Sequence, residues 1–269
     1  MKKIFFTTIA FIAAFVVNAQ TIKVYEYDGN RNLNSTPSFT SSNKVKVIFT
    51  EDKEPEAEHE YVDLGLPSGT LWATCNIGAE SPTEKGLFFA WGDIEGHTED
   101  YEFSWNNYKF FGGTNPYPTF TYQMTKYTYQ NNKTNGDYNI DLDHCDDAAY
   151  VIWGHDWEMP TNYQVGELVY NCCWDLTNDY NGTGVSGCIA YKVKSDDDRG
   201  KRIIDGKVTN KYNLSDPHIF FASGETWSRS LNVEENNSSI VLNIGSNQGA
   251  MQASTSRNCG LNIRPVRLK

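Results

Sequence analysis

Two acidic runs hold the residue types that suit a metal ion. The first, "DLDHCDD" (141–147), combines four aspartates with a histidine and a cysteine, and the second, "KSDDDRGK" (194–201), has three consecutive aspartates. Calcium loops need alternating oxygen ligands and a glycine that lets the loop fold around one point. Neither run has that spacing, so the first predicts a helix start with acids at its positive end and the second a solvated turn. We expect no cofactor and no metal site; calcium at 194–201 is the alternative.

No arrangement of residues in the sequence is typical of a catalytic centre. The five histidines are scattered, and no Ser-His-Asp motif surrounds any of them. The stretch "GETWSRS" (224–230) lacks the G-x-S-x-G elbow that exposes a nucleophilic serine. Paired carboxylates for glycoside hydrolysis are recognised by their separation in space, which a sequence does not give. We therefore predict no catalytic residues and a protein that is not an enzyme, with a secreted enzyme as the least favoured alternative.

The last third of the chain carries the residues that suit ligand binding. Between residues 226 and 266, apolar positions such as Val241 and Leu242 alternate with Asn, Ser, Gln and Arg, which offer adaptable hydrogen bonds. One interpretation is a solvated edge strand with loops. The other is a binding face anchored by Trp227, a residue that fits a buried strand equally well. The binding face predicts ligand contacts from Trp227, Arg229, Asn243, Asn247, Gln248 and Arg257.

The N-terminus and the charge limit where the protein acts and what it binds. Residues 1–19 have the basic start, short apolar run and small final residue of a cleaved secretory signal peptide. We therefore expect a secreted or cell-surface protein. Removal of Lys2 and Lys3 leaves 21 basic and 34 acidic residues, a net charge of −13. This sign disfavours nucleic acid and anionic membranes, and no later segment is apolar enough to be a transmembrane segment.

Composition divides the mature chain into three parts. "TIKVYEY" (21–27) and "NKVKVIF" (43–49) predict two strands of a small β-rich unit over residues 20–50. "EDKEPEAEHE" (51–60) has six acids and a proline, which predicts a solvated linker. The main domain is therefore expected over residues 61–269.

Two segments of the main domain have helical features. Residues 141–154 begin with acids and end at Gly154, and residues 160–174 offer Thr161 as an N-cap. In the second segment, apolar residues follow the helical spacing i, i+3, i+4, i+7: Val165, Leu168, Val169 and Cys172. The remainder predicts short strands and long loops, with residues 93–140 wrapping the surface.

All six cysteines follow the signal peptide. An exported chain meets an oxidising compartment, so disulfide bonds are the expected state. The chain has no C-x-x-C motif, and the adjacent Cys172 and Cys173 are a poor geometry for two ligands of a structural zinc.

Several motifs stand in an order that resembles one protein family. They are "YVDLGLPSGTLWATCNIGA", "FFAWGD", "DDAA", "WEMPT", "TWS" and the final "IRPV". With these motifs, residues 60–269 resemble the Fibrobacter succinogenes major paralogous domain family, which is similar to the C-type-lectin-like and formylglycine-generating-enzyme-like superfold. The resemblance implies an α+β, C-type-lectin-like domain with short strands, two helices and long loops. It also implies secreted or surface proteins of gut-type bacteria.

The resemblance implies local details as well. Cys75 and Cys172 stand where relatives often have cysteine, so Cys75–Cys172 is the implied disulfide. The first and last strands should pair and place "YVDL" beside "LNIRPV". The turn should lie at residues 67–69, and Trp72 should enter the core. Only Cys259 stands where formylglycine-generating enzymes have a cysteine pair, so that activity is not implied.

Together these features predict a secreted or surface-exposed binding module that recognises a glycan or protein ligand through its C-terminal face. Lectin-like folds bind ligands on that surface, which is an analogy of fold. The ligand should be neutral or cationic, because the acidic chain repels anions. The alternative is a structural subunit of a surface fibre or pilus, in which residues 20–50 exchange a strand with another subunit.

Overall fold

The computed structural model describes residues 20–25, 46–51, 59–112, 124–129, 137–245 and 249–268, the first two ranges as backbone only. The chain divides between Glu58 and His59 into two units. The signal peptide predicted at 1–19 and most of the linker predicted at 51–60 lie outside the described residues.

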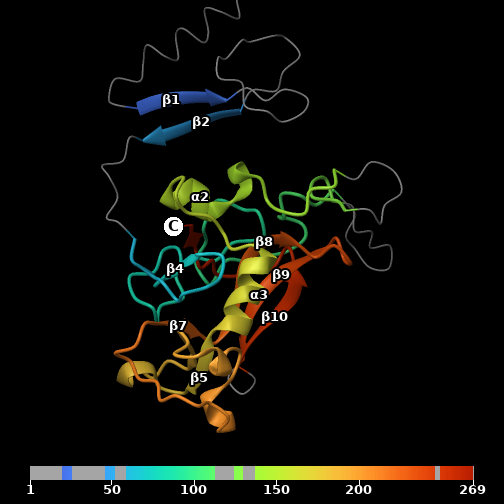
Figure 1. Cartoon of the computed structure of the whole chain (residues 1–269). Coiled ribbons are helices and arrows are strands. Elements are labelled where there is room, and N and C mark those ends of the chain that lie inside the picture. Colours follow the sequence, from blue (N-terminus) through green and yellow to red (C-terminus); the bar gives the residue numbers. More distant parts are fainter. Residues whose placement is uncertain are drawn as a thin grey trace, which may run out of the picture. The chain divides into compact units, whose positions relative to one another are not determined.

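In the first unit, strands β1 (Gln20–Tyr25) and β2 (Lys46–Glu51) form an antiparallel pair (Figure 1). Ile22 lies opposite Phe49, and Val24 lies opposite Val47. The two β-rich runs therefore form strands, as their composition predicts, and these strands pair with each other.

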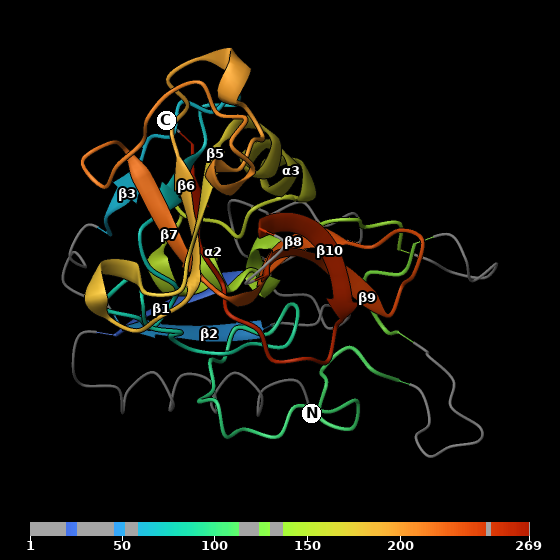
Figure 2. The same cartoon turned by 90° about the horizontal axis from the view of Figure 1, so that it is seen from below.

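The second unit is a mixed α+β structure built on three small antiparallel sheets (Figure 2). The strand orders are β11-β4-β3, β5-β6-β7 and β10-β9-β8. The strands are β3 (Tyr61–Val62), β4 (Leu71–Ala73), β5 (Cys173–Thr177), β6 (Gly187–Tyr191), β7 (His218–Ala222), β8 (Gly224–Leu231), β9 (Ser238–Gly245), β10 (Gly249–Ser256) and β11 (Val266–Arg267). The α+β class predicted from the sequence is thus confirmed at this coarse level.

The first sheet brings the two ends of the second unit together, with one correction to the prediction. The turn after Leu66 is present, since the Gly69 N–H donates to the Leu66 carbonyl at 2.9 Å. This turn returns the chain as β4, which pairs with β3 on one side and with β11 on the other. The first and last strands therefore flank β4 and do not pair with each other. In the sheet Trp72 lies opposite Val62 of β3 and Val266 of β11, and it is fully buried, as predicted.

Both predicted helices are present. The acidic segment forms a short 3-10 turn, η1 (His144–Asp146), and then α2 (Ala148–Trp153), which ends at Gly154. Helix α3 (Asn162–Asn171) starts with a complete capping box, because Thr161 and Gln164 bond each other's backbone N–H groups. Further 3-10 turns are η2 (Tyr180–Gly182), η3 (Asp196–Asp198) and η4 (Ile203–Asp205). No helix among the described residues is long and apolar enough to cross a bilayer.

Strand β9 separates the two largest core clusters. Successive side chains of a strand point to opposite faces, so Val241 joins one cluster with Trp91 and Trp227. Leu242 joins the other, which includes Val165 of α3. Helix α3 lies along this sheet in Figure 1. The last third of the sequence is rich in Asn, Ser, Gln and Arg, yet its strand β9 buries side chains on both faces.

Candidate ligand-binding site

Trp227 belongs to the core and is not an exposed anchor. Its side chain is 0% exposed, and its indole Nε1–H donates to the Phe89 carbonyl at 2.7 Å. Its backbone N–H donates to the Asn262 carbonyl at 2.9 Å. The buried-strand alternative for this residue is therefore correct.

Arg257 is also buried, inside a cage of aromatic rings. Its guanidinium lies 4.6 Å from the centre of the Trp91 ring, and its Nε donates to the Tyr108 hydroxyl at 2.8 Å. Its other nitrogens donate to the backbone carbonyls of Lys126, Tyr127 and Asn236 at 2.9–3.2 Å. Arg257 thus fastens three separated chain segments and offers no donor to a surface ligand, which corrects its predicted role.

The remaining predicted contacts do not gather at one place. Arg229 has an 11% exposed side chain, which pairs with Glu158 and donates to the Leu142 carbonyl. Asn243 donates to Glu225 within the β8-β9 pair. Asn247 and Gln248 lie outside the described residues. The described members of the predicted face therefore make structural contacts within the domain.

The predicted disulfide is absent. All six cysteines lie in the described ranges, and none of them forms a disulfide bond in this structure. Cys172 is fully buried in the core cluster that contains Val165 of α3, and this burial raises the pKa of its thiol. Cys75 follows β4 and is only half-buried.

Trp227→Phe gives a direct check on this core assignment. The smaller ring fills most of the site, and the Phe89 carbonyl loses the indole donor but keeps the Leu261 N–H. We expect the free energy of unfolding to fall by about 1–3 kcal/mol, because one buried hydrogen bond is lost and the smaller ring leaves unfilled volume in the core. Urea unfolding followed by fluorescence or circular dichroism measures the change. A loss below about 0.5 kcal/mol, typical of surface positions, would instead place Trp227 at the surface.

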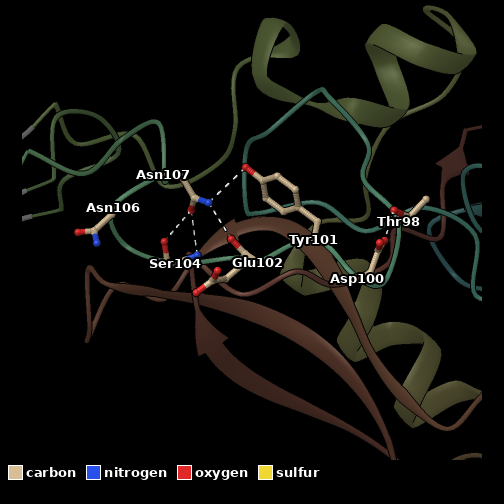
Figure 3. Close-up of a pocket in the computed structure, with 7 residues that line it drawn as sticks. All are labelled: Thr98, Asp100, Tyr101, Glu102, Ser104, Asn106 and Asn107. Atoms are coloured by element: carbon tan, nitrogen blue, oxygen red, sulfur yellow. Dashed lines mark hydrogen bonds between the residues drawn. The ribbon is translucent and has the colours of Figure 1, made fainter.

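A polar hollow of about 700 Å³ lies in the loop over residues 98–107 (Figure 3). Its lining comprises Thr98, Asp100, Tyr101, Glu102, Ser104, Asn106 and Asn107. Tyr101 is the one aromatic residue in this lining, and its side chain is 39% exposed. The hollow thus presents one ring among hydroxyl, amide and carboxylate groups.

Ring contacts and a bridging amide hold the hollow in shape. The Tyr101 ring stacks on His97 with 3.8 Å between centroids, and the edge of Phe103 packs against it at 4.8 Å. Figure 3 shows Asn107 linked to three neighbours: its amide donates to the Tyr101 hydroxyl and the Glu102 carbonyl, and accepts from Ser104. The aromatic face is therefore positioned before any ligand arrives.

Close packing connects this loop to the chain segment around Gly260 and Leu261, near the C-terminus. His97 forms a bridge with Phe88, and the next residue, Phe89, forms one with Leu261. A Cβ atom at Gly260 would lie 2.1 Å from Phe103 Cε2, closer than carbon atoms approach, so this position requires glycine. The hollow is therefore supported by the core cluster that contains Trp91 and Trp227.

The Asp100 carboxylate of the hollow remains ionised. The hydrogen bond from Thr98 lowers the pKa of Asp100 below its usual value. A general acid needs the opposite shift, a pKa raised towards neutrality. Asp100 therefore acts as a hydrogen-bond acceptor and as a repulsive charge towards anions.

The first acidic run is engaged by lysines. Asp143, Cys145 and Asp146 bring ligand atoms within 4.8 Å of one another. Lys126 pairs with both of these aspartates, and Lys109 pairs with Asp146 at 2.9 Å. Burial favours the neutral acid, but the two lysines outweigh it and lower the pKa of Asp146. This cluster is an internal ion-pair network beside the first core cluster.

The second acidic run is only partly solvated, which corrects its prediction. Asp196 and Asp197 are exposed, but Asp198 is 0% exposed. Its carboxylate accepts five hydrogen bonds, from the N–H and side-chain groups of Thr209 and Asn210 and from the Tyr212 hydroxyl. Asp198 thus anchors the loop over residues 207–213, to which Lys194, Ser195 and Lys201 add further hydrogen bonds.

No protein-family model matches this chain, and neither a search of curated proteins nor a search of solved structures returned a match. The family resemblance of the motifs therefore remains a prediction.

Proposed function

We propose that this protein is an exported binding module of C-type-lectin-like architecture that recognises a glycan through the hollow over residues 98–107. The observation that carries the proposal is the exposed Tyr101 ring, fixed by its stack on His97 and surrounded by polar side chains. Sugars present apolar C–H faces and many hydroxyl groups, so they match a ring with adaptable hydrogen-bonding neighbours.

Charge favours a neutral or cationic glycan. Asp100 and Glu102 both line the hollow, and the pKa of Asp100 is lowered, so the site stays negative at neutral pH. Like charges at a binding site suppress the wrong partner and slow its approach. We accordingly place binding in the 98–107 loop and no longer on the predicted C-terminal face, where Trp227 and Arg257 are buried.

Asn106 supplies a further contact for the ligand. Its side chain is exposed, lines the hollow and forms no hydrogen bond with any described residue. Figure 3 shows it separate from the network around Asn107. The Asn106 amide can therefore donate to and accept from a sugar hydroxyl without breaking an internal bond.

A glycan array tests the proposal. The full chain should bind neutral glycans saturably, and Tyr101→Ala should weaken the best of them at least about tenfold, the loss typical of a central aromatic contact. Tyr163→Ala is the matched control, because Tyr163 is 82% exposed on α3 and outside the hollow. Unchanged stability of both variants would separate binding from folding. Equal binding by Tyr101→Ala and wild type, or no saturable binding to any glycan, would refute the proposal.

A further inference from the structure

A second cavity, of about 210 Å³, lies where the chain passes from one sheet to another. Strand β7 ends at Ala222 and β8 begins at Gly224, so Ser223 alone connects them. Figure 2 shows β7 and β8 in separate sheets. The lining of the cavity includes Phe88, Phe221 and Leu261 as apolar walls and Arg264, Asn76, Glu225 and Lys85 as polar groups, of which Lys85 pairs with Glu99. The cavity shares no lining residue with the 98–107 hollow.

Arg264 is the unusual member of this lining. It is 1% exposed, and its guanidinium lies 4.8 Å from the centre of the Phe221 ring. Nε donates to the Asn76 side chain at 2.7 Å, and Nη1 donates to three backbone carbonyls at 2.8–3.3 Å. No described residue accepts a hydrogen bond from Nη2. Nη2 is also not among the fully buried side-chain atoms that lack a partner, so part of its surface is accessible. Nη2 is therefore the group that opens to the cavity.

The charge of Arg264 is not neutralised within the described residues. It forms no ion pair there, whereas Arg229 pairs with Glu158 and Arg267 approaches Asp156. Glu225, the acid in the cavity wall, is held instead by Asn243 at 2.8 Å and Thr255 at 2.6 Å. Burial lowers the pKa of Arg264 to about 10, so the side chain stays cationic at neutral pH. A buried, unpaired cation is costly unless an anion accompanies it.

We propose that this cavity binds a small organic carboxylate, with the carboxylate on Arg264 Nη2 and an apolar body against Phe88, Phe221 and Leu261. A cavity of this size is below the range of about 300–1,000 Å³ that drug-sized ligands occupy, which limits the ligand to a single ring or a short chain. The open Nη2 donates a charge-assisted hydrogen bond to a carboxylate oxygen, so a monocarboxylate fits better than a larger polyanion. The negative charge of Glu225 repels the ligand carboxylate and so lowers the affinity.

Benzoate is the probe, titrated into the isotope-labelled full chain with the amide signals of residues 223–226 followed by NMR. We expect saturable shifts with a Kd on the order of 1 mM, appropriate to one charge-assisted bond and a buried ring. Benzamide has the same shape without the charge and should bind at least about tenfold more weakly. Glu225→Gln removes the repulsive charge and should tighten benzoate about threefold.

Two further variants make the test independent of the arginine itself, whose replacement endangers the fold. Ser223→Phe places a ring at the exposed mouth of the cavity and should abolish the shifts. Ile204→Phe places the same ring at a 70% exposed position that does not line the cavity, and should leave benzoate binding unchanged. Shifts that do not saturate, benzamide binding equal to benzoate, or full binding by Ser223→Phe would overturn the proposal. None of these outcomes depends on glycan binding by the hollow.

Discussion

Arg257→Ala is expected to lower the free energy of unfolding by about 5 kcal/mol, which equals the whole stability of a domain at the lower end of the usual range of about 5–15 kcal/mol. The substitution removes a fully buried side chain that carries hydrogen bonds to Tyr108 and to the carbonyls of three other residues. Those acceptors stay buried without donors, and the space among the aromatic rings becomes a cavity. Both effects are destabilising.

Arg257→Lys separates the charge from the shape of the side chain. Lysine keeps the cation but lacks the planar fork that reaches several acceptors at once, so we expect a loss of roughly 2–4 kcal/mol. Arg199→Ala is the control: its pair with the 86% exposed Asp196 contributes about 0–1 kcal/mol, and its one bond to Asn171 adds about 0.5–1.5 kcal/mol. Urea unfolding of the three variants measures the order. If Arg257→Ala cost no more than Arg199→Ala, the cage would not be a structural centre.

Local features of the fold were predictable from the sequence. The capping box at Thr161 and Gln164 and the end of α2 at Gly154 depend on residues close along the chain. The same holds for the turn before Gly69. Their physical causes are backbone hydrogen bonds and preferred dihedral angles, which short segments carry with them.

The roles of Trp227 and Arg257 were not predictable in this way. Both stand among serines and asparagines, and the alternation around them is typical of a half-exposed strand. In the structure β9 lies between two core clusters, so side chains on both of its faces are buried. Arginine is rarely fully buried, and only the rings brought from residues 91, 108, 110 and 127 make this position favourable.

The candidate site in the 98–107 loop was not predictable either, because its composition is that of an ordinary surface loop. The only signal for the hollow was an excess of Tyr, Asn and Thr over residues 93–140, which also fits a surface loop. What distinguishes Tyr101 is its stack on His97 and the support of that loop by Gly260. The contact between Gly260 and Phe103 joins residues far apart in the sequence, and a single sequence does not pair them. The Arg264 cavity likewise forms from four separate segments.

Asp198→Ala is expected to lower the free energy of unfolding by roughly 3–5 kcal/mol, because five part-buried hydrogen bonds to one buried carboxylate are lost at once. The sequence neighbour Asp197 is exposed and supplies the matched control. Asp197→Ala should stay within about 0.5 kcal/mol of wild type. Urea unfolding at neutral pH gives both values.

The same carboxylate should make stability depend on pH in a defined direction. Burial alone would raise the pKa of Asp198, but the bonds from Thr209, Asn210 and Tyr212 outweigh it and hold the pKa well below its usual range. A pKa lowered by folding means that the stabilisation is complete above the unfolded pKa, near about 3.9. It is lost as the pH falls from that value towards the folded pKa.

Asp198→Asn isolates this contribution from that of the other acids. The variant keeps the size of the side chain and one acceptor, so it should fold but be less stable than wild type at pH 7. Below about pH 4 the wild-type carboxylate starts to lose its advantage, so the difference between the two proteins should shrink steadily as the pH is lowered. Unfolding curves at several pH values between neutrality and acid measure this difference. A gap that stays constant across the range would show that the charge of Asp198 is not what holds residues 207–213 in place.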